Sequence, residues 1–480
     1  MEGKSRVSVL PFIVVLPLVF IVLILLGFTM RANQGELIHI PPDLFYAIMT
    51  LHGLGMAGTA AAGGLAALAY LLSRYANVSS KVVNFMFIAY LITVAGLITA
   101  TLIGRFGPGW YVLYPLPFKP MGIWSNWAIG LAVVSLMVLG VAILLIQLEF
   151  FRAMVARYGL KNSLGWQFFT GSGEYAPPIV IITMDAVVLP GILTTLVGAA
   201  LLMLYFLKWI NPALNLDPLL IKNMIFIWGH TLVNITMYMG VAVVYELFPE
   251  FSGREWKSNK YVALAWNATF FIVLLAVFHH LYMDFVQPLP LQITGQTFSY
   301  LATVPSTVVT VMGFIAQVYK SGIRWSFVPL AFFVGIVGWL VGGYAAVIDS
   351  TIVVNTQFHN TLWVPSHFHT YFLLGFYSIL WGFLYYASGS VKETLAKFGF
   401  YSYILGGAGF LAMFYIAGAF GVPRRYAEYT FIPVESVAHL AQLLPKIAVV
   451  FVLYVLIGFI LMTFAIFSGS GRSATSKSWA

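Results

Sequence analysis

Histidines are the residues of this chain that could do the most chemistry where they stand. Six of the nine lie inside long apolar runs, namely His52, His230, His279, His280, His367 and His369. The others, His39, His359 and His439, lie near the ends of such runs. An ionisable side chain at membrane depth is costly and usually faces the protein interior with a function. Six of them therefore indicate metal or proton chemistry.

The adjacent pair at 279 and 280 has the geometry of a shared metal site. Neighbouring residues on an α-helix are separated by about 100°, so the two rings can converge on one point if they use different ring nitrogens. His230 lies in another apolar run and could add a third imidazole. Three imidazoles with an open position suit copper or iron acting on a small gas.

The sequence "HFH" at 367–369 calls for a different arrangement. Residues two apart on a helix are separated by about 200°, so His367 and His369 should serve different partners. Haem iron takes axial imidazoles. Two of the three remaining histidines, His52, His367 and His369, can clamp a six-coordinate haem, and the third can hold a five-coordinate haem facing the three-histidine metal. A proton relay in a transporter is the alternative, but it does not explain both histidine pairs.

Composition identifies the elements that must position these histidines. The chain has 480 residues, of which 61% are hydrophobic and 8% charged, and a mean hydropathy of +0.93. Runs of about twenty apolar residues are long enough to span a bilayer. We predict an all-α polytopic membrane protein, one domain over 1–480 without a large soluble part, with twelve spanning helices at roughly 9–30, 44–74, 80–104, 125–152, 178–208, 220–249, 260–286, 296–319, 327–349, 365–388, 400–420 and 446–468.

Basic residues predict the orientation of these helices. The first apolar run is too long for a signal-peptide core, so we expect it to be retained. A cytoplasmic N-terminus places sixteen of the 24 Lys and Arg residues on the cytoplasmic side, as multi-pass proteins prefer. We expect a protein of the plasma or inner membrane with both termini in the cytoplasm. The net charge of +9 then reflects topology and anionic lipid, and no nucleic-acid partner is needed.

The absence of cysteine restricts the redox partners. With no cysteine in the sequence, this chain cannot hold a disulfide, a thiolate metal site, a covalently attached haem c or a dinuclear copper centre. Electrons must come from a second subunit or a soluble carrier with copper or haem c, or from quinol bound at a lipid-facing site.

Four motifs, "LHGLGM" at 51–56, "GH" at 229–230, "HH" at 279–280 and "HFH" at 367–369, resemble those of the haem-copper oxygen reductase superfamily. The resemblance is to its catalytic subunit I, which has twelve spanning helices, and it covers essentially the whole chain. It implies that His52 and His369 ligate a low-spin haem of b or a type, and that His367 ligates a high-spin haem. The same resemblance assigns the non-haem iron or copper to His230, His279 and His280.

Two further stretches resemble one branch of that superfamily. The sequence "FHNTLWVPSHFH" at 358–369 is most similar to the B branch, and "GVPRRY" at 421–426 is similar to its arginine pair. The resemblance implies that Arg424 and Arg425 bind haem propionates, a use that suits bidentate guanidinium bonding. His359 would lie near the same propionates.

One position departs from the oxygen-reducing members of this family. Those members resemble one another in a tyrosine that follows the metal-binding histidine by four residues and is cross-linked to it. In this chain the corresponding segment is "GHTLVNITMY", and the residue at that position is Asn234. The C branch supplies the tyrosine from the seventh helix, where this chain has Val273. Tyr238 lies about 12 Å of helical rise beyond His230, and Tyr282 lies on a different face from His280, so neither should replace it.

This departure predicts the reaction. Splitting dioxygen needs four electrons, of which the metals give three and a side chain the fourth, whereas coupling two nitric oxide molecules needs two. We therefore predict a nitric oxide reductase of a denitrifying respiratory chain, in which Asn234 offers the metal a carbonyl oxygen or donates to a bound N–O group. Three imidazoles suit copper, while an added oxygen ligand favours iron.

Two other functions remain as alternatives. The first is a B-type terminal oxygen reductase, a cytochrome c or quinol oxidase that reduces dioxygen to water. The second is a non-catalytic haem-binding sensor or proton-coupled transporter.

The proton path of B-branch oxidases is only partly retained. Oxidases of this branch resemble one another in two tyrosines, about eleven and fifteen positions after the metal-binding histidine. They also resemble one another in a Ser/Thr pair on the eighth helix. Here the positions hold Val241 and Tyr245, and Val309 follows Ser306. An apolar side chain interrupts a relay unless water fills the gap. Among the acids near membrane segments, most of which we interpret as interfacial or structural, Asp185 in the fifth predicted helix is the one to test for proton delivery.

Overall fold

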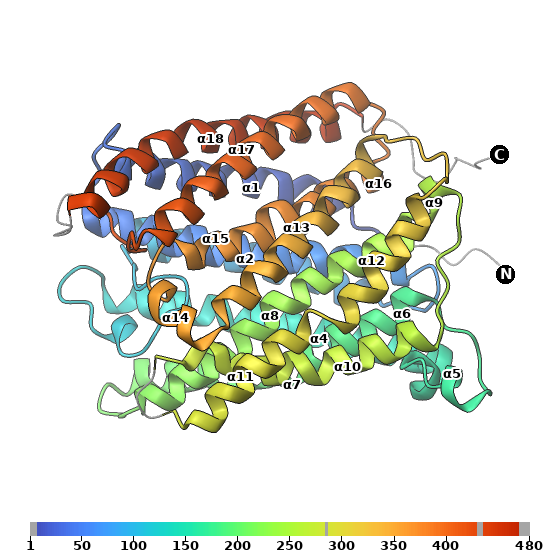
Figure 1. Ribbon diagram of the computed structural model, residues 1–480. Helices are drawn as coiled ribbons and strands as arrows, with labels where there is room; N and C mark the ends of the chain where they lie inside the picture. The colour runs from blue at the N-terminus through green and yellow to red at the C-terminus, as the bar shows by residue number, and fades with distance from the viewer. Residues whose placement is uncertain (1–6, 284–286, 430–434, 470–480) are drawn as a thin grey trace. The chain divides into compact units, whose positions relative to one another are not determined.

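The structure is a computed structural model that describes residues 7–283, 287–429 and 435–469 (Figure 1). Over these residues it is helical and contains no strand, apart from one isolated bridge between Thr361 and Pro423. The chain divides into two compact units. Unit 1 comprises Met1–Ser8, Pro41–Ser321 and Ser350–Ile352, and unit 2 comprises Val9–Ile40, Gly322–Asp349 and Val353–Ala480.

Unit 1 holds the second to eighth predicted spans. Its helices are α2 (Pro42–Leu72), α3 (Ser80–Ile98), η1 (Thr99–Ile103), η2 (Leu116–Phe118), α4 (Asn126–Ser163), α5 (Gln167–Thr170), α6 (Pro178–Ile182), η3 (Thr183–Val188), α7 (Leu189–Ile210), α8 (Pro218–Leu247), α9 (Pro249–Ser252), α10 (Lys260–Ala276), η4 (Val277–Leu281), α11 (Leu289–Ala302) and α12 (Pro305–Val318). Figure 1 shows α7, α8, α10, α11 and α12 running beside one another.

Unit 2 holds the first span and the last four. Its helices are α1 (Leu10–Gln34), α13 (Phe327–Asp349), α14 (Ile352–Phe358), α15 (Trp363–His369), η5 (Thr370–Phe376), α16 (Tyr377–Ser388), α17 (Glu393–Ala419) and α18 (Glu435–Phe467). The helix α18 packs along α17 and α1, and α13 packs against η5 and α16.

Eleven helices of the described residues are long and apolar enough to cross a membrane. The remaining predicted span, 365–388, the tenth along the chain, is helical throughout but is composed of α15, η5 and α16. The predicted span 296–319 begins earlier, at Leu289, and is divided near Thr303, because Pro305 starts a new helix there. The helix within 260–286 ends at Leu281, and 284–286 lie outside the described residues.

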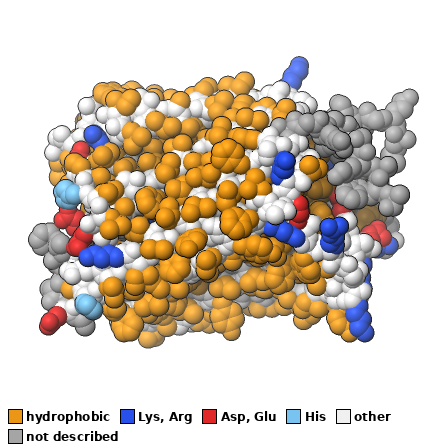
Figure 2. Space-filling view, turned by 90° about the horizontal axis from the view of Figure 1, so that it is seen from above, with side chains coloured by type: hydrophobic (Ala, Val, Ile, Leu, Met, Phe, Trp, Pro, Cys, Tyr) orange, Lys and Arg blue, Asp and Glu red, His pale blue; other side chains and the backbone are white. Residues whose placement is uncertain are grey.

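The surface agrees with a lipid environment. Figure 2 shows hydrophobic side chains across the middle of the face in view and charged side chains towards its margins. Large apolar side chains such as Val450 and Leu453 on α18 are 55% and 43% exposed. An aqueous surface would not keep such an extensive apolar area uncovered.

Ion pairs fix one end of unit 1, the end at which α2 and α8 finish. The Nη1 atom of Arg74 lies 3.1 Å from Glu246 and 2.9 Å from Glu250. The Tyr75 hydroxyl donates to Glu246 over 2.9 Å. Burial and then the charge of Glu246 raise the pKa of Tyr75, so this phenol stays protonated and keeps donating. These contacts hold the loop after α2 against the end of α8.

A second carboxylate anchors the connection between α2 and α3. Glu149 on α4 is buried and accepts a hydrogen bond from the backbone nitrogen of Ser79 over 2.6 Å. Arg152, one turn further along α4, donates to Glu149 over 2.7 Å and to the carbonyl of Asn77 over 2.8 Å. The part of this short loop next to α3 is therefore bound to α4.

Candidate functional site

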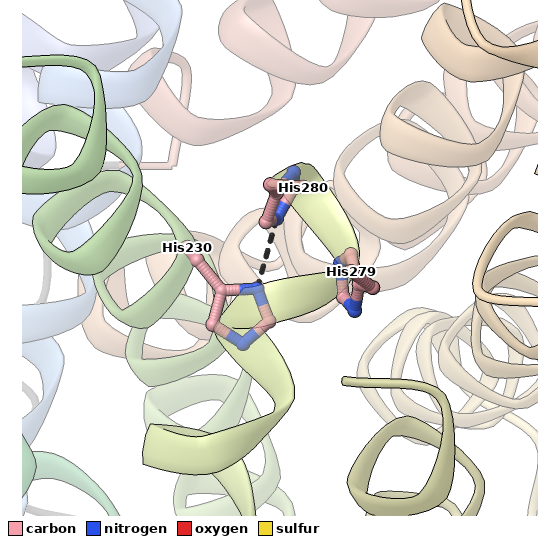
Figure 3. Close-up of side chains that lie close together, drawn as sticks. All are labelled: His230, His279 and His280. Carbon is pink, nitrogen blue, oxygen red and sulfur yellow. Dashed lines mark hydrogen bonds between the residues drawn. The ribbon is translucent and has the colours of Figure 1, made fainter. Parts of the chain in front are cut away.

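Three histidines meet inside unit 1 (Figure 3). His230 comes from the middle of α8, and His279 and His280 come from η4. One ligand nitrogen of each lies within 4.8 Å of those of the other two. His230 Nδ1 is 3.0 Å from His280 Nε2, a separation at which two imidazoles can share one metal ion with bonds of about 2 Å. The predicted three-histidine cluster is present in the fold.

A hydrogen bond to a backbone carbonyl determines which ring nitrogen of His230 can bind a metal. Its Nε2 lies 3.2 Å from the carbonyl oxygen of Val273 on α10. A carbonyl only accepts hydrogen bonds, so Nε2 carries the proton and donates. Nδ1 then keeps its lone pair and faces His280. Hydrogen bonds of this kind orient metal-binding imidazoles and raise their basicity.

The tautomer of His279 follows from a serine on another helix. The Ser299 hydroxyl on α11 donates to the carbonyl of Gly295 over 2.6 Å. A hydroxyl has a single proton, so at His279 Nδ1, 2.7 Å away, Ser299 must accept. His279 therefore carries its proton on Nδ1 and offers Nε2 to a metal. Ser299 is only 6% exposed, so water does not compete for these bonds.

Direct backbone packing holds the histidine pair in place. A Cβ atom added at Gly295 would lie 2.7 Å from the backbone nitrogen of His279 and 2.8 Å from the carbonyl carbon of Phe278. Only glycine allows α11 to approach η4 this closely. On the other side, the ring of Phe226 stacks on His280 with centroids 5.0 Å apart.

Asn234 lies next to this cluster, one helical turn from His230. Its Nδ2 donates to the carbonyl of His230 over 2.8 Å and is 3.4 Å from His230 Nε2. The amide nitrogen of Asn234 is thus hydrogen-bonded within its own helix. The side-chain oxygen of Asn234 is the group that can bind a metal or accept a hydrogen bond. Tyr238, a further turn along, packs edge-on against Trp266 with centroids 5.5 Å apart.

The two histidines of "HFH" lie on α15 in unit 2. His367 Nδ1 donates to the carbonyl of Gly342 over 3.0 Å, and His369 Nδ1 donates to the carbonyl of Pro365 over 2.6 Å. Both rings therefore keep Nε2 for a ligand. The ring of Phe410 contacts His369 edge-on with centroids 5.5 Å apart.

The remaining predicted ligands occupy half-buried or exposed positions in their own units. His52 lies on α2 of unit 1, where Thr50 accepts a hydrogen bond from the Gly109 nitrogen over 2.9 Å. In unit 2, Arg424 Nη2 donates to Asn360 over 3.4 Å, and His359 Nδ1 lies 3.2 Å from the Asn355 amide oxygen. Arg425 is exposed, with a φ of 72°.

One buried polar atom fits a polar group bound beside these ligands. Arg31 Nη1 on α1 is buried and has no hydrogen-bond partner within the part of the chain that the structure describes. The Arg31 guanidinium lies over the ring of Phe414, which is in edge contact with His369. Buried donors are rarely left unsatisfied, so this atom is consistent with a cofactor whose ligand His369 supplies.

Part of the predicted proton path is hydrogen-bonded. The Tyr245 hydroxyl lies 3.1 Å from the Thr310 hydroxyl, and both are buried. Ser306 is buried, and its hydroxyl has no partner among the residues with described positions. Val241 is fully buried between Tyr238 and Tyr245, so the interruption expected from the sequence is present.

Sequence reasoning missed three contributors to the metal cluster: the Val273 carbonyl, Ser299 and Gly295. The only signal was a glycine and a serine four residues apart, Gly295 directly before the eighth predicted span and Ser299 within it. Nothing in that spacing connects them to His279, because the contact forms between two different helices.

The family model described as "Cytochrome C and Quinol oxidase polypeptide I" matches residues 7–460 of this chain. The chain is 28% identical over 232 residues to cytochrome c oxidase polypeptide 1 of Halobacterium salinarum, a match covering 46% of this chain and 38% of that protein. It is 26% identical over 271 residues to a probable quinol oxidase subunit 1 of Staphylococcus aureus, with 55% and 40% covered. It is 29% identical over 252 residues to heme-copper oxidase subunit I+III of Aeropyrum pernix, with 49% and 29% covered.

These matches therefore span less than half of each curated relative. A solved heme-copper terminal oxidase dimer shares the fold, with a TM-score of 0.76 and 18% identity, over 98% of this chain and 86% of that one.

Proposed function

Because the chain belongs to the cytochrome c and quinol oxidase polypeptide I family, we propose that it is the catalytic subunit of a nitric oxide reductase. Family membership makes it a membrane-bound oxidoreductase and implies haem groups and a metal centre. In the proposed reaction, two nitric oxide molecules, two electrons and two protons give one nitrous oxide and one water. The electron count and the proton count both balance.

The observation that carries this proposal is the asparagine beside the metal cluster. Asn234 occupies the turn after His230, and its amide is hydrogen-bonded to that turn. An amide has no accessible oxidation, so this position cannot give an electron. When bound, the metal at the histidines and a high-spin haem would supply one electron each for nitric oxide, and three together at most, which is one too few for splitting dioxygen.

The residues of the cluster have defined tasks in this proposal. His230 Nδ1, His279 Nε2 and His280 Nε2 would hold the non-haem metal, which is iron or copper. Val273 and Ser299 fix the tautomers that leave these nitrogens free. Asn234 contributes its carbonyl oxygen, either to the metal or to a hydrogen-bond donor in the site.

The haem ligands are proposed from the family relationship and the local hydrogen bonds. We assign His52 and His369 to the low-spin haem and His367 to the high-spin haem. His367 and His369 both carry their proton on Nδ1, which leaves the nitrogen that binds haem iron. Arg424 and Arg425 would pair with propionates, and His359 would lie near them.

The second candidate function is a B-type terminal oxygen reductase. Two of the curated relatives are named as a cytochrome c oxidase and a probable quinol oxidase. The Tyr245–Thr310 hydrogen bond also retains part of the route that such oxidases use. A haem sensor or transporter is a third reading, and consumption of either gas by the reduced protein would exclude it.

We place the chain in the plasma or inner membrane with both termini in the cytoplasm. Its electron donor would be a copper- or haem c-bearing second subunit, a soluble carrier of the same kind or quinol. The single domain with twelve spans remains part of this proposal.

The decisive experiment is anaerobic turnover of the purified, reduced protein with nitric oxide. Nitrous oxide is followed by gas chromatography, beside oxygen uptake with the same donor. Fast nitrous oxide formation with slow or peroxide-releasing oxygen uptake supports the proposal. Rapid, clean oxygen reduction with little nitrous oxide would refute it and establish the second candidate.

A further inference from the structure

A buried acid in unit 1 has no role in the site described above. Asp185 lies in the π-helix η3 and is only 1% exposed. Among the described residues, no cation lies within ion-pair distance of its carboxyl group. Asp185 Oδ2 accepts a single hydrogen bond, from Asn267 Nδ2 over 2.8 Å. An acid without a counter-charge at membrane depth is rare and usually functional, and π-helices are frequent at functional sites.

Asn267 connects this acid to the surface of unit 1. Its Oδ1 accepts a hydrogen bond from Trp166 Nε1 over 2.8 Å, and Trp166 is 48% exposed. Its Nδ2 also donates to the carbonyl of Leu164 over 2.9 Å. One amide side chain therefore separates Asp185 from a residue that reaches solvent or lipid headgroups, at the end where α4 finishes and α10 begins.

Asn267, the partner of Asp185, lies on the helix that leads to the histidine pair. Asn267 precedes His279 by twelve residues, or about 18 Å of helical rise. Trp266, its neighbour, is in edge contact with Tyr238 on α8, with centroids 5.5 Å apart. The helices α8 and α10 both pack against η3, so Asp185, Trp266 and Tyr238 lie on three elements that contact one another.

The face of α8 that begins at His230 carries polar groups at regular steps. Asn234 and Tyr238 follow at i+4 and i+8, which places all three side chains on one side of the helix. Each step is about 6 Å of rise, a distance that one hydrogen-bonded water can bridge. Asn267, Tyr238 and Asn234 thus stand at about 18, 12 and 6 Å from the level of the cluster.

We propose that Asp185 is the proton-holding group of a delivery route that runs from Trp166 and Asn267, through Asp185 and Tyr238, to Asn234 and the three histidines. Water at the Trp166 end gives a proton to Asp185, which releases it through bridging water to Tyr238. The Tyr238 hydroxyl takes one proton and gives another, and Asn234 orients the last water. Each turnover moves two protons and leaves every side chain in its starting state.

This route differs from the retained family path. Tyr245 turns to Thr310 on α12 and stacks on Trp256 with centroids 3.9 Å apart, whereas Asp185 is bonded to α10. The proposed route depends on the proposed function only for which gas is reduced. Reduction of oxygen also consumes protons, so the same route could supply either reaction.

The experiment uses the assembled holoprotein in liposomes and compares Asp185→Asn, Asp185→Glu and Tyr238→Phe. Thr310→Val tests the competing path through Tyr245 and Thr310. Three quantities are measured: turnover, proton uptake on mixing the reduced protein with gas, and the carboxylic C=O band in redox-difference infrared spectra. We expect Asp185→Asn to slow turnover and proton uptake about 100-fold, the usual size of a lost proton-transfer group, and to abolish the band. Asp185→Glu should restore most of the rate, and Thr310→Val, which interrupts the separate Tyr245–Thr310 path, should slow proton uptake far less than Asp185→Asn does.

Several results would overturn the route. Unchanged proton uptake in Asp185→Asn would do so, as would slow uptake in Thr310→Val beside normal uptake in both Asp185→Asn and Tyr238→Phe. If Asp185→Asn lost its haem or metal, Tyr238→Phe would decide, since it removes a hydroxyl alone. If the wild type reduced oxygen and not nitric oxide, the proposed function would fail, and the same variants would test the route by oxygen uptake.

Discussion

At the scale of single residues, the metal cluster depends on where protons sit on imidazole rings. His230 and His279 each donate one N–H to a protein acceptor, the Val273 carbonyl and the Ser299 hydroxyl. This leaves Nδ1 free on the first ring and Nε2 free on the second. A neutral imidazole has only one such free nitrogen. The Val273 carbonyl and the Ser299 hydroxyl therefore determine which nitrogen of each ring can bind the metal.

Removal of the Ser299 hydroxyl should weaken the metal centre without unfolding the protein. Loss of such an orienting partner typically costs about 10–100-fold in metal affinity. We expect Ser299→Ala to retain less non-haem metal during dialysis against a chelator, measured as metal per protein. Ser299→Thr, which keeps the hydroxyl, should resemble the wild type.

Thr294→Ala is the control for this substitution. Thr294 lies on the same helix, is half-buried and, among the described residues, donates to the carbonyl of Pro290 alone. Equal metal loss in Ser299→Ala and Thr294→Ala would show that Ser299 does not orient His279.

A tyrosine at position 234 should not improve nitric oxide reduction. The reaction needs two electrons, and a phenol adds a third donor that it does not use. The larger ring must also displace the Asn234 amide from the His230 turn. We expect Asn234→Tyr to form nitrous oxide at or below the wild-type rate in the anaerobic assay.

Asn234→Gln serves as the control, because it keeps the amide at a changed distance. A nitrous oxide rate clearly above that of the wild type in Asn234→Tyr would show that the missing phenol limits catalysis.

At the scale of elements, the functional groups lie where regular helix is interrupted. The pair His279 and His280 lies in the 3-10 segment η4, Asp185 lies in the π-helix η3, and the π-helix η5 directly follows His369. A change in helical pitch redirects side chains that regular spacing would turn elsewhere. Hydropathy predicted most of the helices, but these local changes of pitch depend on packing between elements and leave no periodic pattern.

The contact between α11 and η4 should be intolerant of a single added methyl group. A Cβ at position 295 would lie too close to the backbone of Phe278 and His279, which cannot rotate away. Overpacking costs about 1–3 kcal/mol, which corresponds to roughly 5- to 150-fold in metal affinity if the whole cost falls on the metal-bound state. We expect Gly295→Ala to lose metal and to unfold at a lower temperature in detergent.

Gly140→Ala is the matched control, because its Cβ would meet only a Leu202 methyl at 3.9 Å. A Gly295→Ala protein with full metal content would contradict the close packing of α11 on η4.

At the scale of the whole molecule, the distribution of basic residues predicts which ends of the helices face the cytoplasm. The loop 171–177 follows Arg157 and Lys161, whereas the loop 211–217 lies on the opposite side of α7. Basic loops are retained in the cytoplasm. A fluorescent reporter inserted at 171–177 should therefore be active, and alkaline phosphatase should be active only at 211–217. The reverse pattern would show that the orientation is inverted.

The features that could be predicted are those that depend on residues close together in the sequence. The spans and the six histidines were visible because hydrophobicity and residue type are local properties. The helical character of the fold and the family resemblance are confirmed. The partners of those histidines were not visible, because Val273 and Ser299 reach His230 and His279 from other helices. The link between Asp185 and Asn267 joins residues 82 positions apart, beyond any sequence period.

The ion pairs of Arg74 have a consequence for the biogenesis of the protein. Its acceptors, Glu246 and Glu250, follow 172 and 176 positions later in the chain. Synthesis proceeds from the N-terminus, so α2 must wait in the membrane, with its guanidinium in water or at the headgroups, until α8 has been inserted. The bond therefore forms late and joins an early helix to a newly made one. Substitution of Arg74 should thus first reduce the amount of mature protein, because the nascent chain is degraded. The molecules that do assemble should keep their activity.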